Sequence, residues 1–107
     1  MDMKPEIIVK FLKKFISPKW NGILEYDVSF SAHDDTGEIY LMVDVIFDMN
    51  EYQKIYSSGK YDHLGGFDSA ISSDIRRMLR YLNIYKSYIE IYVMDNDAPD
   101  YRPNPLL

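Results

Sequence analysis

The sequence predicts an α+β fold, a two-layer sandwich with the element order α-β-β-(α)-α-β and a three-stranded, mainly antiparallel sheet that carries its helices on one face. Two observations predict this class. Apolar residues occupy every second position across 24–32, 39–47 and 87–95, the period of a β-strand. Across 5–16 and 68–83 they recur at steps of three and four, which is typical of amphipathic helices.

The first helix is expected over residues 5–16. Pro5 suits a position in the first turn, and Ser17-Pro18 ends the helix because a residue before proline avoids the helical conformation. Trp20 follows, and we expect it to be buried at this corner. The helix should face the core with an apolar stripe and water with three lysines. The stripe comprises Ile7, Ile8, Phe11, Leu12, Phe15 and Ile16, and the lysines are Lys10, Lys13 and Lys14.

A β-hairpin is expected next. Its loop, residues 33–38, has the Asp and Gly content of a tight connection, so the strands on either side should pair antiparallel. The alternation predicts ten inward positions, which are Leu24, Tyr26, Val28, Phe30 and Ala32 in the first strand and Ile39, Leu41, Val43, Val45 and Phe47 in the second.

A short helix and a long helix are expected after the hairpin. Asn50 is the expected N-cap of the short helix over 50–58, with Gln53 at the capping-box position. The long helix over 68–83 should expose three arginines and bury an apolar stripe. The stripe consists of Ile71, Ile75, Met78, Leu79 and Leu82.

The third strand has two possible neighbours. After a crossover it lies either parallel beside the second strand or antiparallel beside the first. We favour the antiparallel arrangement, because antiparallel pairs outnumber parallel ones in known sheets. The expected domain spans 1–95, and residues 96–107, which contain three prolines, form an extended tail.

Helices on one face of the sheet leave the other face open, and the outward strand positions there are unusually apolar. They include Tyr40, Met42, Ile46, Tyr88, Tyr92 and Met94. A contiguous apolar patch on a small protein marks an interface more often than a solvated surface. We therefore hypothesise a non-enzymatic interaction or structural module that forms a homo-oligomer, or binds a protein partner, through this face. The open alternative is that the short helix, the middle loop or the tail covers it.

The charge distribution is two-sided. The chain has a net charge of −5, but residues 1–20 carry +3 and residues 21–66 carry −7. The acidic residues of the sheet face disfavour nucleic acid there, so an alternative hypothesis places weak nucleic-acid or anion binding on the long helix, at Arg76, Arg77 and Arg80.

If the short helix forms, the element order resembles the type II KH arrangement of RNA-binding domains. The resemblance is topological. KH domains hold the nucleic-acid backbone with a G-x-x-G loop. The corresponding stretch here has Gly59, then Lys60-Tyr61-Asp62-His63, then Gly65-Gly66, with no G-x-x-G. No function of that family is therefore transferred to this chain.

Few residues suggest catalysis. The chain has no cysteine, which excludes disulfides, thiolate zinc sites and cysteine nucleophiles. His33, beside Asp34 and Asp35, and His63 in the middle loop are the candidates for a third hypothesis, an enzyme of unknown reaction. Turn formation explains both sites more simply. No catalytic residue is assigned, and no metal or cofactor is expected.

The composition of the chain also gives expectations about its cellular location and the genome that encodes it. No targeting segment and no apolar run of membrane-spanning length is visible, so we expect a cytoplasmic protein with no membrane partner. Residues with AT-rich codons (Ile, Tyr, Lys, Asn) number 35 and those with GC-rich codons (Ala, Arg, Gly, Pro) number 17. This bias is typical of AT-rich genomes such as those of many phages and small-genome bacteria, and a protein encoded by a phage would be associated with the virion.

Overall fold

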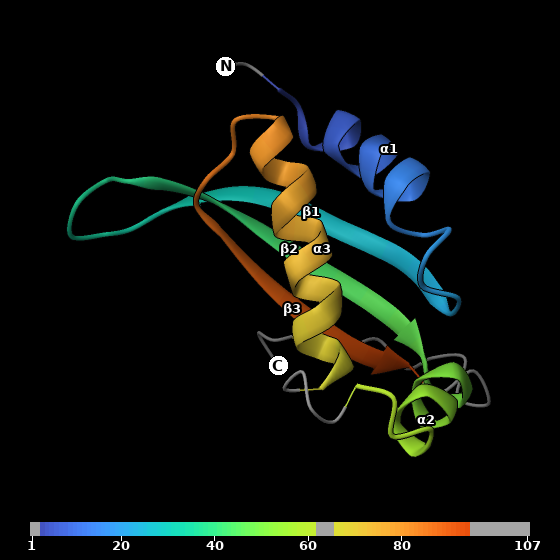
Figure 1. Ribbon diagram of the computed structural model, residues 1–107. Helices are drawn as coiled ribbons and strands as arrows, with labels where there is room; N and C mark the ends of the chain where they lie inside the picture. Colours follow the sequence, from blue (N-terminus) through green and yellow to red (C-terminus); the bar gives the residue numbers. More distant parts are fainter. Residues whose placement is uncertain (1–2, 62–65, 95–107) are drawn as a thin grey trace.

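The computed structural model describes residues 3–61 and 66–94 and shows a helical layer on one face of a sheet (Figure 1). In chain order the elements are α1 (Pro5–Phe15), β1 (Ile23–Ala32), β2 (Ile39–Asp48), α2 (Met49–Ser57), α3 (Phe67–Tyr81) and β3 (Ser87–Met94). α1 and α3 lie across the same face, and α2 lies at the end of the sheet where β2 finishes (Figure 1). The α+β sandwich is therefore confirmed. The tail predicted at 96–107 lies outside the described residues.

β2 is the central strand of the sheet, whose order is β1-β2-β3. It pairs antiparallel with β1 and parallel with β3. The preference for β3 antiparallel beside β1 was therefore wrong. β1 has polar residues at its outward positions, whereas β2 carries apolar residues on both of its faces. Such a strand is better suited to the centre of a sheet, where neighbours flank it on both edges.

The core lies between the sheet and the helices. All four central inward residues of β2 are fully buried, and each such side chain contributes roughly 1.5–3 kcal/mol by leaving water. They are Leu41, Val43, Val45 and Phe47. Facing them are Ile8, Leu12 and Ile16 from the α1 segment and Phe67, Ile71, Ile75 and Leu79 from α3. The predicted stripe of the long helix is confirmed except at Leu82, which is only half-buried.

Several residues predicted to face inward are exposed. At Leu24 the cause is a β-bulge, since the register shifts between Ile23 and Glu25 and breaks the alternation. Phe30, Ala32 and Ile39 are exposed because the tip of the hairpin extends beyond the helices that cover the rest of the sheet (Figure 1). The period-two pattern therefore continues past the end of the core.

α1 buries a narrower stripe than its sequence suggests. Ile8, Leu12 and Ile16, spaced four apart, are buried, but Ile7 and Phe15 remain 41% and 48% exposed. The i, i+4 row of these three buried residues contacts the sheet. The neighbouring row, which contains Phe11 and Phe15, faces α3 instead. The prediction that all six apolar residues enter the core was wrong for Ile7 and Phe15.

Trp20 is buried at the corner after α1, as predicted. Its indole Nε1 donates a hydrogen bond to Asp74 Oδ2 at 3.0 Å, and its ring contacts those of Tyr61 and Phe67. The side chain thereby joins the corner after α1 to the middle of α3.

The N-cap of α2 is Asp48, and Asn50 lies inside the helix. Asp48 ends β2 in an extended conformation, and its Oδ2 accepts a hydrogen bond from the Glu51 backbone N–H at 3.1 Å. The prediction of Asn50 as the cap was wrong because the strand runs directly into the helix. A residue that is still extended can cap the helix, whereas a residue already in it cannot.

Gly22 lies against this junction. Its carbonyl accepts the Asp48 N–H at 2.8 Å, and its φ is +110°. A Cβ at this position would approach Phe47 Cε1 to 2.7 Å and the Glu51 Cβ to 2.6 Å. Only glycine therefore allows the start of β1 to approach the start of α2 this closely.

Asp48→Ala should lower the free energy of unfolding by about 1 kcal/mol, because the helix loses its cap. Asn50→Ala is the matched control and should change it by less than about 0.5 kcal/mol. Urea denaturation of both variants measures the difference. A larger loss from Asn50→Ala would contradict the assignment of the cap.

Candidate functional site on the open sheet face

The strand register places all six predicted interface residues on the face opposite α1 and α3. Across β2 and β3, Met42 is paired with Tyr88 and Ile46 with Tyr92, and Tyr40 and Met94 lie at the two ends of the face. Tyr88 is 48% exposed, whereas Ile46 is only 6% exposed and so offers almost no contact area. The patch spans two strands, and the Asp44–Glu90 pair interrupts it between these two apolar pairs. Its role as an interface stays a prediction.

An aromatic cluster forms at the hairpin end of this face. The ring of Tyr40 lies 4.5 Å from that of His33 and 5.0 Å from that of Tyr88, with the two tyrosines edge to face. His33 was considered for catalysis or for the turn, but not for this face. His33 follows the last residue of β1, and continuing the alternation of that strand by one residue would have placed His33 on the open face.

An ion pair between Lys86 and Glu38 lies at the same end. The hydrogen bond from Lys86, together with its positive charge, holds the pKa of the Glu38 carboxyl below its usual range. Glu38 lies two residues before Tyr40, and Lys86 lies two residues before Tyr88. The alternation of the strands therefore places both on the open face, just beyond the ends of β2 and β3. The charges at this end of the face are therefore already paired within the chain.

A row of carboxylates crosses the middle of the face. Asp44 is paired with Asp27 on β1 and with Glu90 on β3. Within the described residues, the Asp44 Oδ1 atom is buried and has no hydrogen-bond partner. Burial raises the pKa of Asp44, and the charges of Asp27 and Glu90 raise it further. The pKa of Tyr92 is also raised, by burial and then by Asp44 and Glu90.

This row is a strip of like charge. In residues 3–61 and 66–94, no group of three His, Cys, Asp or Glu side chains is arranged to hold a metal ion. The strip divides the aromatic end of the face, at Tyr40 and Tyr88, from the part that contains Tyr92 and Met94. It thus places a negative band within the apolar surface that β2 and β3 form.

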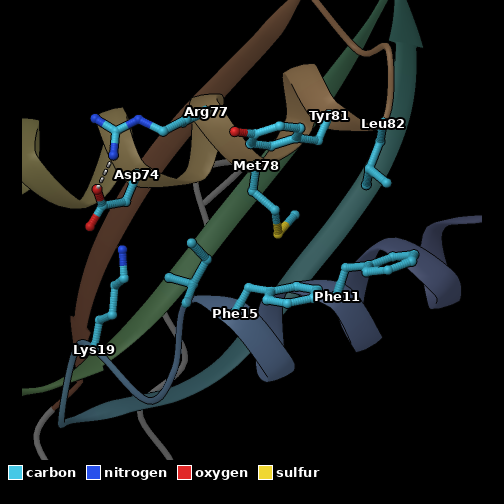
Figure 2. Close-up of a pocket in the computed structure, with 9 residues that line it drawn as sticks. Phe11, Phe15, Lys19, Asp74, Arg77, Met78, Tyr81 and Leu82 are labelled. Carbon is cyan, nitrogen blue, oxygen red and sulfur yellow. Dashed lines mark ion pairs between the residues drawn. The ribbon is translucent and has the colours of Figure 1, made fainter.

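A groove separates α1 from α3 on the helical side, and the sequence did not predict it. Its volume is about 500 Å³, within the usual range of ligand-binding pockets. Apolar side chains line its length, and Lys19, Asp74 and Arg77 lie together at one end (Figure 2). The apolar lining is formed by Phe11, Phe15, Ile16, Met78, Tyr81 and Leu82. The apolar stripe of α1 is two rows of side chains wide, but only one row contacts the sheet. This second apolar row was the signal in the sequence for a groove.

The three candidate arginines are exposed on α3. Arg77 forms an ion pair with Asp74 at 3.7 Å, in the same helix. Asp74 also accepts the Trp20 hydrogen bond, so both of its oxygens have partners. His63, the other candidate for catalysis, lies outside the described residues, and no helix in the described part of the chain is long and apolar enough to cross a membrane.

No family model, curated protein or solved structure matches this chain. Function must therefore be inferred from the two surfaces themselves. One is the open sheet face with its acidic row, and the other is the α1–α3 groove with its cationic end.

Asp44→Asn should stabilise the protein at pH 7 by up to about 1 kcal/mol, a value that allows for solvent screening. Because the folded-state pKa of Asp44 is raised, the folded protein holds more protons than the unfolded chain, and stability falls as pH rises from about 4 through that raised pKa. The advantage of the variant should therefore grow as pH rises through the raised pKa of Asp44 and vanish below about pH 4.

Thermal or urea unfolding between pH 3 and 8 measures this dependence. Asp35→Asn, at an exposed position in the hairpin loop, is the control with the same change in net charge. A stabilisation by Asp44→Asn that does not vary with pH, or an equal stabilisation by Asp35→Asn, would contradict the prediction that the ionised carboxylate of Asp44 destabilises the fold.

Proposed function

We propose that this protein is a non-enzymatic interaction module whose open sheet face binds a second copy of the chain. The observation that supports this proposal is the register, which brings Tyr40, Met42 and Tyr88 together on the face that α1 and α3 leave uncovered. Aromatic and methionine side chains are enriched at protein interfaces. A structural or accessory role suits a module of this kind.

The size of the face indicates weak association. β2 and β3 share eight paired positions, which at about 3.3 Å each, with three strands about 4.8 Å apart, give a flat area of roughly 400 Å². A stable interface buries about 800 Å² on each partner. Association through this face should therefore appear at high protein concentration.

Tyr88→Ala should raise the dissociation constant of the self-association by at least about tenfold, because Tyr88 is the most exposed tyrosine of the face and tyrosine is enriched among the residues that carry most of the binding energy of an interface. Tyr56→Ala is the control, since Tyr56 is equally aromatic and 70% exposed but belongs to α2. Sedimentation equilibrium up to millimolar concentration measures both variants. A protein that stays monomeric throughout this range would refute the proposal, as would equal effects of the two substitutions.

The second candidate function is weak binding of nucleic acid by α3. Arg76 and Arg80 support it, because both are exposed on one helix.

If α3 binds nucleic acid, the protein should be retained on single-stranded RNA at low salt and released as salt rises. Arg76→Gln with Arg80→Gln should abolish that retention, while Lys54→Gln, on α2, should not. An absence of retention at low salt would reject this candidate.

A further inference from the structure

The open sheet face and the α1–α3 groove both contain exposed apolar side chains, and they lie on opposite sides of the sheet. On the open face, Tyr88 is half-exposed. In the groove on the helical side, Phe15 is 48% exposed and Tyr81 is 83% exposed (Figures 1 and 2). If the protein associated through the open face alone, the exposed apolar side chains of the groove would remain in contact with water.

The two surfaces carry opposite charge. The outward positions of the three strands contain carboxylates and no lysine or arginine, and the acidic residues there include Glu25, Asp27, Asp44 and Glu90. At the end of the groove, Asp74 already binds Arg77 and Trp20, and Lys19 forms no ion pair with any described residue. The exposed lysines of α1 and arginines of α3 extend this positive charge along both helices.

Like charges disfavour the simplest dimer. In a two-fold dimer through the open face, each face meets its own copy, and an axis through the middle of the face would set the carboxylate row of one copy against the same row of the other. Like charges that meet in an interface cost several kcal/mol. When the acidic face meets the cationic end of the groove, the same charges attract each other.

We propose that the open sheet face of one copy docks on the α1–α3 groove of the next copy, in a head-to-tail assembly. This rests on the self-association proposed above and assigns the partner surface. Tyr88 is the most exposed of the face tyrosines, and the groove of about 500 Å³ has room for an aromatic ring. Asp27 and Glu90 then lie near Lys19 and Arg77. Each docked copy retains one free face or groove, so assembly continues beyond the dimer.

Salt dependence tests this arrangement without any substitution. Raising the salt concentration from 0.1 to 1 M shortens the screening length from about 10 Å to about 3 Å. Head-to-tail docking should weaken several-fold, because salt screens an attraction. Two acidic faces packed together would associate more tightly, because salt screens a repulsion. Sedimentation velocity at both salt concentrations distinguishes the two results, and tighter association at high salt would overturn the proposal.

Charge reversal provides the second test. The groove variant, Lys19→Glu with Arg77→Glu, should weaken association at least about tenfold, and so should the face variant, Asp27→Lys with Glu90→Lys. A chain with all four substitutions restores opposite charges across the contact and should recover association. All four residues are exposed, and circular dichroism with thermal unfolding checks that each variant is folded.

The outcomes separate the two proposals. If the wild-type protein does not associate, the proposed function fails and this inference fails with it. If the wild type associates and the groove variant does so equally well, the sheet face binds another sheet face, and only the head-to-tail inference is overturned. Failure of the fourfold variant to recover, while remaining folded, also overturns the inference.

Discussion

The central position of β2 determines how the rest of the molecule is arranged. Its inward residues are completely buried under α1 and α3, and both of its edges are hydrogen-bonded to neighbouring strands. Because side chains alternate along a strand, burying Val43 and Val45 on one face obliges Met42, Asp44 and Ile46 to lie on the other. The core and the open face are therefore two consequences of one register.

That register also accounts for the unfavourable position of Asp44. A one-residue shift would move its carboxylate into the core and expose the valines, which would cost far more than the present arrangement. Asp44 instead remains partly buried between Asp27 and Glu90, with a raised pKa. A strip of like charge in the sheet gives the open face a polarity that a purely apolar patch would lack, and in the proposed assembly it favours a basic partner surface over a second acidic one.

The helical layer has a corresponding gap. α1 reaches the sheet with one row of side chains, and α3 is joined to the corner after α1 through the hydrogen bond from Trp20 to Asp74. The neighbouring apolar row, which contains Phe11 and Phe15, is left between the two helices. The groove is thus a result of helices that pack on a sheet more completely than they pack on each other.

The sequence by itself determined the helices and strands and most of their inward faces, because residue periodicity and turn composition act over a few neighbouring residues. It also identified the apolar outward positions, such as Tyr40 and Tyr88, from the same alternation. Periodicity could not reveal the bulge at Leu24 or the cap at Asp48, since both depend on where one element gives way to the next.

Only the tertiary structure decided the rest. The parallel pairing of β3 with β2, the carboxylate row, the contact of His33 with Tyr40 and the α1–α3 groove all join residues far apart in the chain or lying on different elements. The sequence allowed two neighbours for β3, and general statistics favoured the wrong one. The choice depended on which strand could take a neighbour on each of its two edges, and that is a property of the whole sheet.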